Sequence, residues 1–273
     1  MASTIAPPLA VTPPAVSGRR YGLYSVANMR DEADLHWQVG VEWEALRGGL
    51  ADAVEHGCLP QEGEAALVPA EGVDTVEAVP LVVVGSYSCP AAGRGLDDAR
   101  QRAEQHLLAG EERAVERALA VGDVGNTPHL GEADELAPAA AVGLVEAVGL
   151  LEGWLAVNSH SAGALYGPAQ LGAWVSQVRA AERVGDHLET LAGSRLALGG
   201  GFDQAVEEDG DLGADEVWLW ASARPQVWRS PVFVPDDEQA WMWTDTNVVT
   251  VFAQRTVVVA FDGEPVKVRV EVS

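Results

Sequence analysis

The sequence predicts an α+β protein with helices in the middle of the chain and strands toward both ends. Apolar residues recur at helical period over 95–122, which predicts one long amphipathic helix. Apolar and polar residues alternate over 35–44, which predicts a strand, and a series of β-rich segments follows residue 216. The chain has 273 residues, of which 48% are hydrophobic, so it can bury a substantial core.

The predicted helix over 95–122 is the longest element and has signals at both ends. Two aspartates lie in its first turn, where the helix dipole favours negative charge, and a glycine ends it. Asp98 is spaced to pair with Arg102, and Arg100 with Glu104. At about 1.5 Å per residue it spans roughly 38 Å, which suits a helix that supports a sheet. Its apolar positions are Leu96, Ala99, Ala103, Leu107, Leu108, Ala114, Val115, Leu119 and Val121.

Two β-segments precede this helix and enclose a long excursion. The first is the strand over 35–44, and the second is the β-rich text of 73–84, where Pro80 predicts an edge or a bend. Between them lie about 28 residues of irregular, glycine-rich sequence, longer than ordinary connections. We expect this excursion to be functional or to reach a partner.

Helices and strands alternate after residue 122. The pattern predicts a helix over 132–158, a strand over 164–166, a helix over 169–183 with Pro168 in its first turn, and a hairpin over 188–198. Gly199 to Gly201 are interpreted as a tight turn. The later predicted strands are 217–221, 227–234, 248–252, 256–261 and 266–272.

The N-terminus is rich in proline and lacks the pattern of a signal peptide. Basic residues are absent before Arg19, so we expect the protein to be made in the cytoplasm. Paired prolines favour an extended arm, which a neighbouring subunit could hold in place. The apolar window 136–157 contains Glu146 and Glu152, so it is interpreted as a buried helix and a membrane partner is not expected.

The charge pattern argues against a protein that grips nucleic acid. The net charge is −24, and an acidic surface repels phosphates, although it does not prevent a shell from enclosing DNA. Cys58 and Cys89 are too few for a disulfide scaffold and are interpreted as reduced thiols; whether they meet stays open.

The sequence predicts no catalytic, cofactor-binding or metal-binding residue. His56 and Cys58 lack a second ligand pair, and the acidic run 207–211 lacks the spacing of a calcium loop. The run from Ser159 to Ser161 lacks the Gly-x-Ser-x-Gly context of a nucleophile. The nine tryptophans fit either a core or a protein interface, and both interpretations stay open.

The order of the pieces resembles the major capsid protein of tailed phages, which has the Hong Kong 97-like fold. The resemblance runs from about Tyr21 to the end and is strongest to capsid proteins of actinobacterial phages. It is carried by Ser88-Cys89, AEQHLLAGEERAVERA at 103–118, LEGWLAVNSHSAGALYGP at 151–168, HLETLAGSRLALGGGFD at 187–203 and NVVTVFAQRTVVVAFDG at 247–263.

The resemblance implies a domain plan. Residues 1–34 correspond to an N-terminal arm and 35–80 to the extended loop region. Residues 81–122 and 244–273 correspond to a peripheral domain with the spine helix, and 123–243 to an axial domain.

The resemblance also implies partners. These are other copies in hexamers and pentamers, scaffolding, portal and decoration proteins, and enclosed double-stranded DNA; the protein is then a virion component assembled in the host cytoplasm. The arginines Arg19 and Arg20 and the tryptophans Trp37 and Trp43 are the interface residues we expect. Because 35–80 contains no lysine, the lysine-based crosslink of some relatives is not expected.

Three other interpretations stay open at this point. An encapsulin-like shell would share the fold but enclose protein instead of DNA. A minor or decoration capsid protein is the second alternative. A small hydrolase using His160 or His187 is the interpretation from another class.

Overall fold

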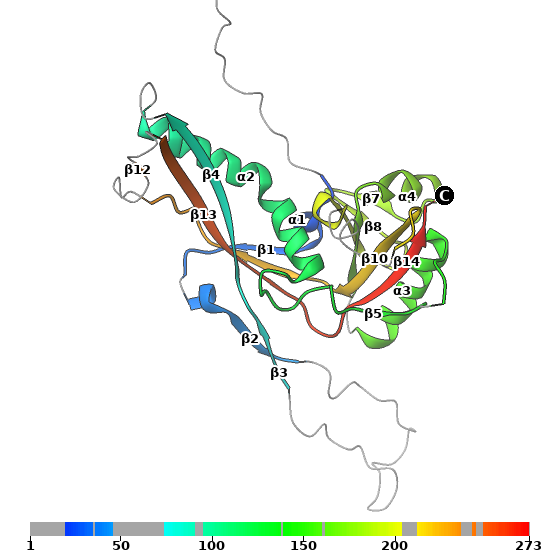
Figure 1. Cartoon of the computed structure of the whole chain (residues 1–273). Helices are drawn as coiled ribbons and strands as arrows, with labels where there is room; N and C mark the ends of the chain where they lie inside the picture. Colours follow the sequence, from blue (N-terminus) through cyan, green and yellow to red (C-terminus); the bar gives the residue numbers. More distant parts are fainter. Residues whose placement is uncertain are drawn as a thin grey trace, which may run out of the picture.

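A computed structural model describes residues 20–34, 36–45, 74–90, 95–137, 139–159, 162–203, 212–235, 242–243 and 248–272. It combines helices with three β-sheets, which confirms the predicted α+β class. Figure 1 shows an elongated sheet and helix on one side, a second sheet with two helices on the other, and a narrow β-pair that projects from the junction.

The elongated sheet is built around one long strand. Its strands are β1 (Asn28–Asp31), β4 (Leu81–Pro90), β11 (Gln226–Arg229), β12 (Met242–Trp243) and β13 (Val248–Ala260). β13 is antiparallel to β4 over 248–257 and to β11 over 257–260. The prediction of two separate strands here was wrong, because the polar residues Gln254 and Arg255 continue the pairing with β4.

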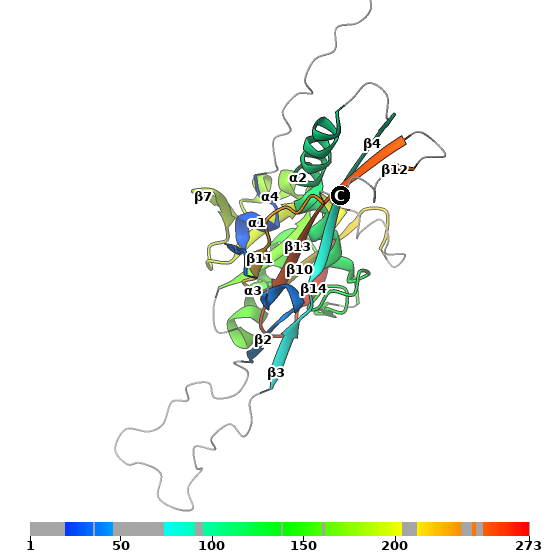
Figure 2. The ribbon, with the colours of Figure 1, turned by 90° about the vertical axis from the view of Figure 1, so that its left-hand side faces the viewer.

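The helix α2 (Leu96–Val121) packs on β4 and β13, as the views in Figures 1 and 2 show. Its predicted extent is confirmed, and Gly122 ends it in the left-handed conformation with φ of 76°. A Cβ at Gly85 of β4 would overlap the backbone of Ala103 and Leu107, so glycine permits the close contact.

The predicted faces of α2 need correction. Leu108 and Ala114 are exposed, whereas Glu111 and Glu116 are buried, because α1 and the segment after β9 cover that side. The Asp98–Arg102 pair is present at 3.0 Å. Arg100 pairs with Asp97 at 3.3 Å, and the predicted pair of Arg100 with Glu104 stays a prediction.

The second sheet has seven strands in the order β5-β14-β10-β6-β9-β8-β7. They are β5 (Asp134–Glu135), β6 (Gly163–Pro168), β7 (Glu182–Val184), β8 (His187–Glu189), β9 (Arg195–Gly199), β10 (Glu216–Ala223) and β14 (Val266–Glu271). β10 is buried on both faces. Trp218 and Trp220 join the core beneath α2, whereas Val217 and Leu219 join the core beneath α3 and α4.

The two helices of this part are shorter than predicted. α3 spans Leu144–Asn158 and not 132–158, since residues 134–135 pair with β14 and a proline at 138 cannot donate a helical hydrogen bond. α4 spans Leu171–Val178 and not 169–183. Pro168 belongs to β6, and Arg179 ends the helix with φ of 55°. The predicted hairpin is confirmed by the antiparallel pairing of β8 and β9.

The projecting β-pair consists of β2 (Val41–Glu44) and β3 (Thr75–Ala78), and residues 46–73 between them lie outside the described residues. The predicted strand over 35–44 was half wrong. Residues His36–Val39 form a 3₁₀ helix, since Gly40 has φ of 130° and breaks the strand. The predicted break at Pro80 is confirmed, because β3 ends at 78 and β4 starts at 81.

The short helix α1 (Leu23–Val26) precedes β1 and lies between α2 and the seven-stranded sheet. Within the described residues, no helix combines the length and apolar character needed to cross a membrane.

Candidate functional site

Two glutamates of α2 hold the N-terminus of α1. The backbone N–H of Leu23 donates to Glu116 Oε1 at 3.0 Å, and that of Tyr24 donates to Glu112 Oε1 at 3.0 Å. The first N–H groups of a helix have no partner inside it, and Gly22 at the N-cap has no side chain to accept them. A Cβ on Gly22 would overlap both carboxylates. The carboxylates of α2 therefore cap α1.

Glu116 also ties the chain after β9 to α2. Its Oε2 accepts the Gly201 N–H at 2.9 Å, and the residue is only 1% exposed. A Cβ at Gly199 would overlap the Glu116 carboxyl group. The tight turn predicted for Gly199–Gly201 was wrong, because residues 200–203 form a helical turn and the glycines let the backbone approach this carboxylate.

Glu111 extends this contact to the elongated sheet. It is 3% exposed and accepts hydrogen bonds from Tyr24 Oη at 2.9 Å, Arg229 Nη1 at 3.3 Å and Arg255 Nη1 at 2.7 Å. Arg229 also binds both oxygens of Asp31 at 2.8 and 3.0 Å. These contacts join α1, α2, β1, β11 and β13. Together with the contacts of Glu112 and Glu116 described above, we call them the α1 anchor.

The electrostatics of the α1 anchor follow from this geometry. Burial and the neighbouring Glu111 raise the pKa of the Tyr24 phenol, so it stays a neutral donor. The hydrogen bond from Arg229 lowers the pKa of Asp31. The anchor fixes residues 21–31, the place where residues 1–19 join the described chain.

The predicted interface residues lie in two different places. Trp37 and Trp43 belong to one apolar cluster at the base of the β2–β3 pair. Trp37 packs against Val258 and Ala260 and is 7% exposed, so it lies buried in its own chain and not on an outward strand. Arg20 is exposed beside α1, and Arg19 lies outside the described residues. An interface role for these four residues stays a prediction.

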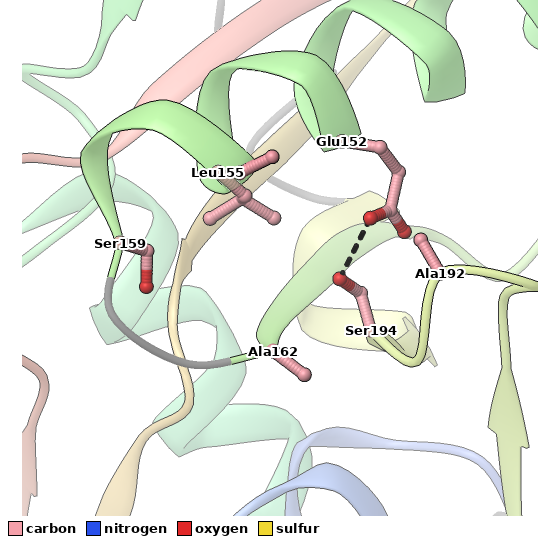
Figure 3. A pocket seen from close by; sticks show the side chains of 7 residues that line it. Glu152, Leu155, Ser159, Ala162, Ala192 and Ser194 are labelled. Carbon is pink, nitrogen blue, oxygen red and sulfur yellow. Dashed lines mark hydrogen bonds between the residues drawn. The ribbon is translucent and has the colours of Figure 1, made fainter. Parts of the chain in front are cut away.

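A hollow of about 300 Å³ lies between α3 and the turn that joins β8 to β9 (Figure 3). Glu152 on α3 points into it and accepts hydrogen bonds from Thr190 Oγ1 and, at 3.1 Å, from Ser194 Oγ. Ser159 also lines it, while Ser161 lies outside the described residues. The Glu152 carboxylate therefore holds the β8–β9 turn against α3, which is a structural role.

The geometry gives no support to a hydrolase that uses His187. Its Nδ1 lies 3.0 Å from Asp186 Oδ1 and its Nε2 lies 3.1 Å from Glu189 Oε2, so both ring nitrogens are engaged by carboxylates. A general base needs one nitrogen directed at the nucleophile. His160, the other histidine considered, lies outside the described residues.

Metal ligands do not gather in the part of the chain that the structure describes, where no three of His, Cys, Asp or Glu are placed to hold an ion. Cys89 is buried as a free thiol, and Cys58 lies outside the described residues.

Sequence reasoning missed the glutamates of the α1 anchor. One signal was present, because Glu111 stands four residues after Leu107 and four before Val115 and so occupies an apolar position of the helical stripe. An acid at such a position requires a buried partner.

Comparison with solved structures gives the fold. No family model matches the sequence, and no curated protein matches it. A structure described as the capsid of an empty GTA particle has a TM-score of 0.57 and 13% identity, over 98% of this chain and 95% of that chain. A structure from Mycobacterium phage Adephagia has a TM-score of 0.54 and 14% identity, over 96% and 92%. The cyanophage Pam1 capsid has a TM-score of 0.52 and 9% identity, over 98% and 97%. The chain therefore has the fold of the GTA and Pam1 capsid structures, and the capsid fold expected from the sequence is confirmed.

Proposed function

We propose that the chain is a major capsid protein, which assembles into the icosahedral head of a tailed phage. The observation that carries this proposal is the fold match to phage and GTA capsids over 98% of this chain and at least 95% of two such chains. The proposed role is therefore structural and not enzymatic, and the protein's place is the virion.

The described surface offers apolar area for contacts between copies. Val82 and Val84 of β4 point away from α2, and Phe233 pairs with Gln254, the residue opposite Val84. All three side chains are more than half exposed. Grouped exposed apolar residues are typical of protein interfaces, so in the proposed assembly a second copy of the chain buries these three side chains.

The proposed assembly consists of hexamers and pentamers, with scaffolding, portal and decoration proteins as further partners. In it, residues 1–34 form the arm, 35–80 the extended loop region, 81–122 and 244–273 the peripheral domain, and 123–243 the axial domain. Two strands cross the proposed boundary. β14 belongs by sequence to the peripheral domain but lies in the seven-stranded sheet, and β11 belongs by sequence to the axial domain but lies beside β13.

The acidic surface supports an enclosing role toward DNA. With a net charge of −24 the shell would repel the phosphate backbone, so packaged double-stranded DNA would be held without specific binding. Arg19, Arg20, Trp37 and Trp43 remain the proposed interface residues in the arm and the extended loop region.

A truncation tests the role of the arm. We expect the full-length chain to form shells, and a chain lacking residues 1–20 to keep its circular dichroism spectrum but lose shell formation in electron micrographs. The α1 anchor starts after this deletion and should remain intact. Shells formed equally well by the truncated chain would contradict an assembly role for the arm.

A further inference from the structure

Leu191 stands at the tip of the turn that joins β8 to β9, and its side chain is fully exposed. It is the most exposed large apolar side chain in the part of the chain that the structure describes. Turn positions are usually taken by glycine, proline, asparagine, aspartate or serine, for reasons of backbone geometry and local hydrogen bonding. A leucine here buries no surface within its own chain, so packing inside one copy does not explain it.

The turn holds Leu191 in a fixed position. The Gly193 N–H donates to the Thr190 carbonyl at 3.0 Å, and the Thr190 N–H donates to the Ser194 carbonyl at 2.9 Å. The Ser194 N–H donates to Thr190 Oγ1 at 3.1 Å, and Glu152 of α3 accepts the hydroxyls of both residues. Thr190 and Ser194 are buried. Because the turn is already ordered, a partner that binds Leu191 pays little entropy to fix it.

The hollow beside this turn suits an aliphatic side chain. It has a volume of about 300 Å³, and Figure 3 shows it between the end of α3 and the turn. Glu152 is the one charged residue among the described residues that line it, and its two oxygens accept the hydroxyls of Thr190 and Ser194. The other lining residues are Leu155, Ala156, Ser159, Ala162, Ala192 and Ser194.

Charge favours a second copy of the chain as the partner at this place. The net charge of −24 makes two copies repel over most of their surfaces, so copies meet best where both sides lack exposed charge. Leu191 and the hollow meet this condition, because the Glu152 carboxylate is already bound by two hydroxyls. The exposed Ala156 and Val157 at the end of α3 extend the uncharged surface.

We propose that Leu191 of one copy inserts into the hollow of a neighbouring copy, and we call this the Leu191 contact. The proposal rests on the proposed function, since assembly brings copies side by side. Each copy supplies one leucine and one hollow, so the contact can be made head to tail and can repeat around a closed ring, as a hexamer or pentamer requires.

An exchange of side-chain size tests the Leu191 contact. Leu191→Ala shortens the inserting side chain, and Ala156→Leu fills the hollow with a residue that suits a helix. Each change alone spoils the fit, the first by leaving a void and the second by overpacking. Because the loss repeats at every contact of a closed shell, we expect the yield of shells in electron micrographs to fall at least about tenfold for each variant.

Two combinations restore the fit. One chain that carries both Leu191→Ala and Ala156→Leu keeps one leucine in each contact, and its yield should return to within about twofold of the wild type. A mixture of the two single variants can alternate around a six-membered ring, where each hollow then meets a side chain of suitable size. The mixture should therefore exceed either single variant at least about fivefold, which only a contact between copies explains.

Controls separate this contact from folding. Because Leu191 is fully exposed, Leu191→Ala should leave the urea unfolding midpoint of the unassembled chain unchanged. Leu108→Ala removes another exposed leucine, on α2 and away from the hollow, and it should leave the yield of shells unchanged.

Four results would overturn the proposal while leaving the proposed function intact. Both single variants could assemble as well as the wild type. The doubly substituted chain could assemble no better than the weaker single variant. It could recover while the mixture does not, which would place the compensation within one copy. Leu108→Ala could lose as much yield as Leu191→Ala. If the wild-type chain itself forms no shell, the proposed function fails and this inference fails with it.

Discussion

Replacing Glu116 with glutamine should release α1 from α2. The Glu116 carboxylate accepts the N–H groups of Leu23 at 3.0 Å and Gly201 at 2.9 Å. Hydrogen bonds to a charged group contribute about 1.5–3 kcal/mol each, and an unpaired buried donor costs about 1–3 kcal/mol. Glutamine keeps one acceptor and turns its NH₂ group toward the other N–H. We therefore expect Glu116→Gln to weaken the anchor by about 3 kcal/mol, or roughly a hundredfold in the opening equilibrium.

Amide hydrogen exchange measures this opening residue by residue. Exchange at the Leu23 and Gly201 amides should accelerate roughly a hundredfold in Glu116→Gln, whereas amides in β10 should change far less. Glu104→Gln is the matched control, because Glu104 lies exposed on the same helix. Unchanged exchange at Leu23 in Glu116→Gln would refute the idea that this carboxylate caps α1.

Three further changes test other parts of the structure. Gly85→Val places a side chain against the backbone of α2, so the free energy of unfolding measured with urea should fall by about 1–3 kcal/mol. Trp37→Ala removes a buried indole from its own chain and should lower the unfolding free energy of the unassembled chain by about 3–5 kcal/mol; an unchanged value would show that Trp37 acts elsewhere. Arg229 lowers the pKa of Asp31, so their pairing stabilises the fold above the ordinary aspartate pKa of about 3.9 and is lost as the pH falls through the lower folded value. Asp31→Asn should therefore lose less stability than the wild type between about pH 6 and about pH 2, and an equal loss would contradict this pairing.

Elements whose signals are local could be predicted from the sequence. α2 was predicted at nearly its full length, because its apolar period and its two flanking glycines lie within one segment. The strands β6, β10 and β14 are apolar runs bounded by turn residues, and they too appear where expected.

Elements that depend on distant contacts could not be predicted as well. The alternation over 35–44 predicts one continuous strand, but residues 36–39 form a 3₁₀ helix. Trp37 in this helix packs against Val258 and Ala260, more than two hundred residues away along the chain. The polar residues inside β13 looked like a gap between two strands, and only the pairing with β4 shows that the strand continues.

The functional residues were the hardest to predict. The burial of Glu111 and Glu116 depends on α1, a four-residue helix with little signal of its own. A sequence shows where charges stand along the chain but not which of them the fold leaves without a partner.

The oligomeric state of the purified chain tests the central claim most directly. Light scattering after size-exclusion chromatography, with negative-stain microscopy, should be applied to the chain expressed alone and together with the proteins encoded beside it. The proposed function predicts closed shells, or free hexamers and pentamers, in at least one of the two preparations. A 28.7 kDa monomer in both preparations would contradict it.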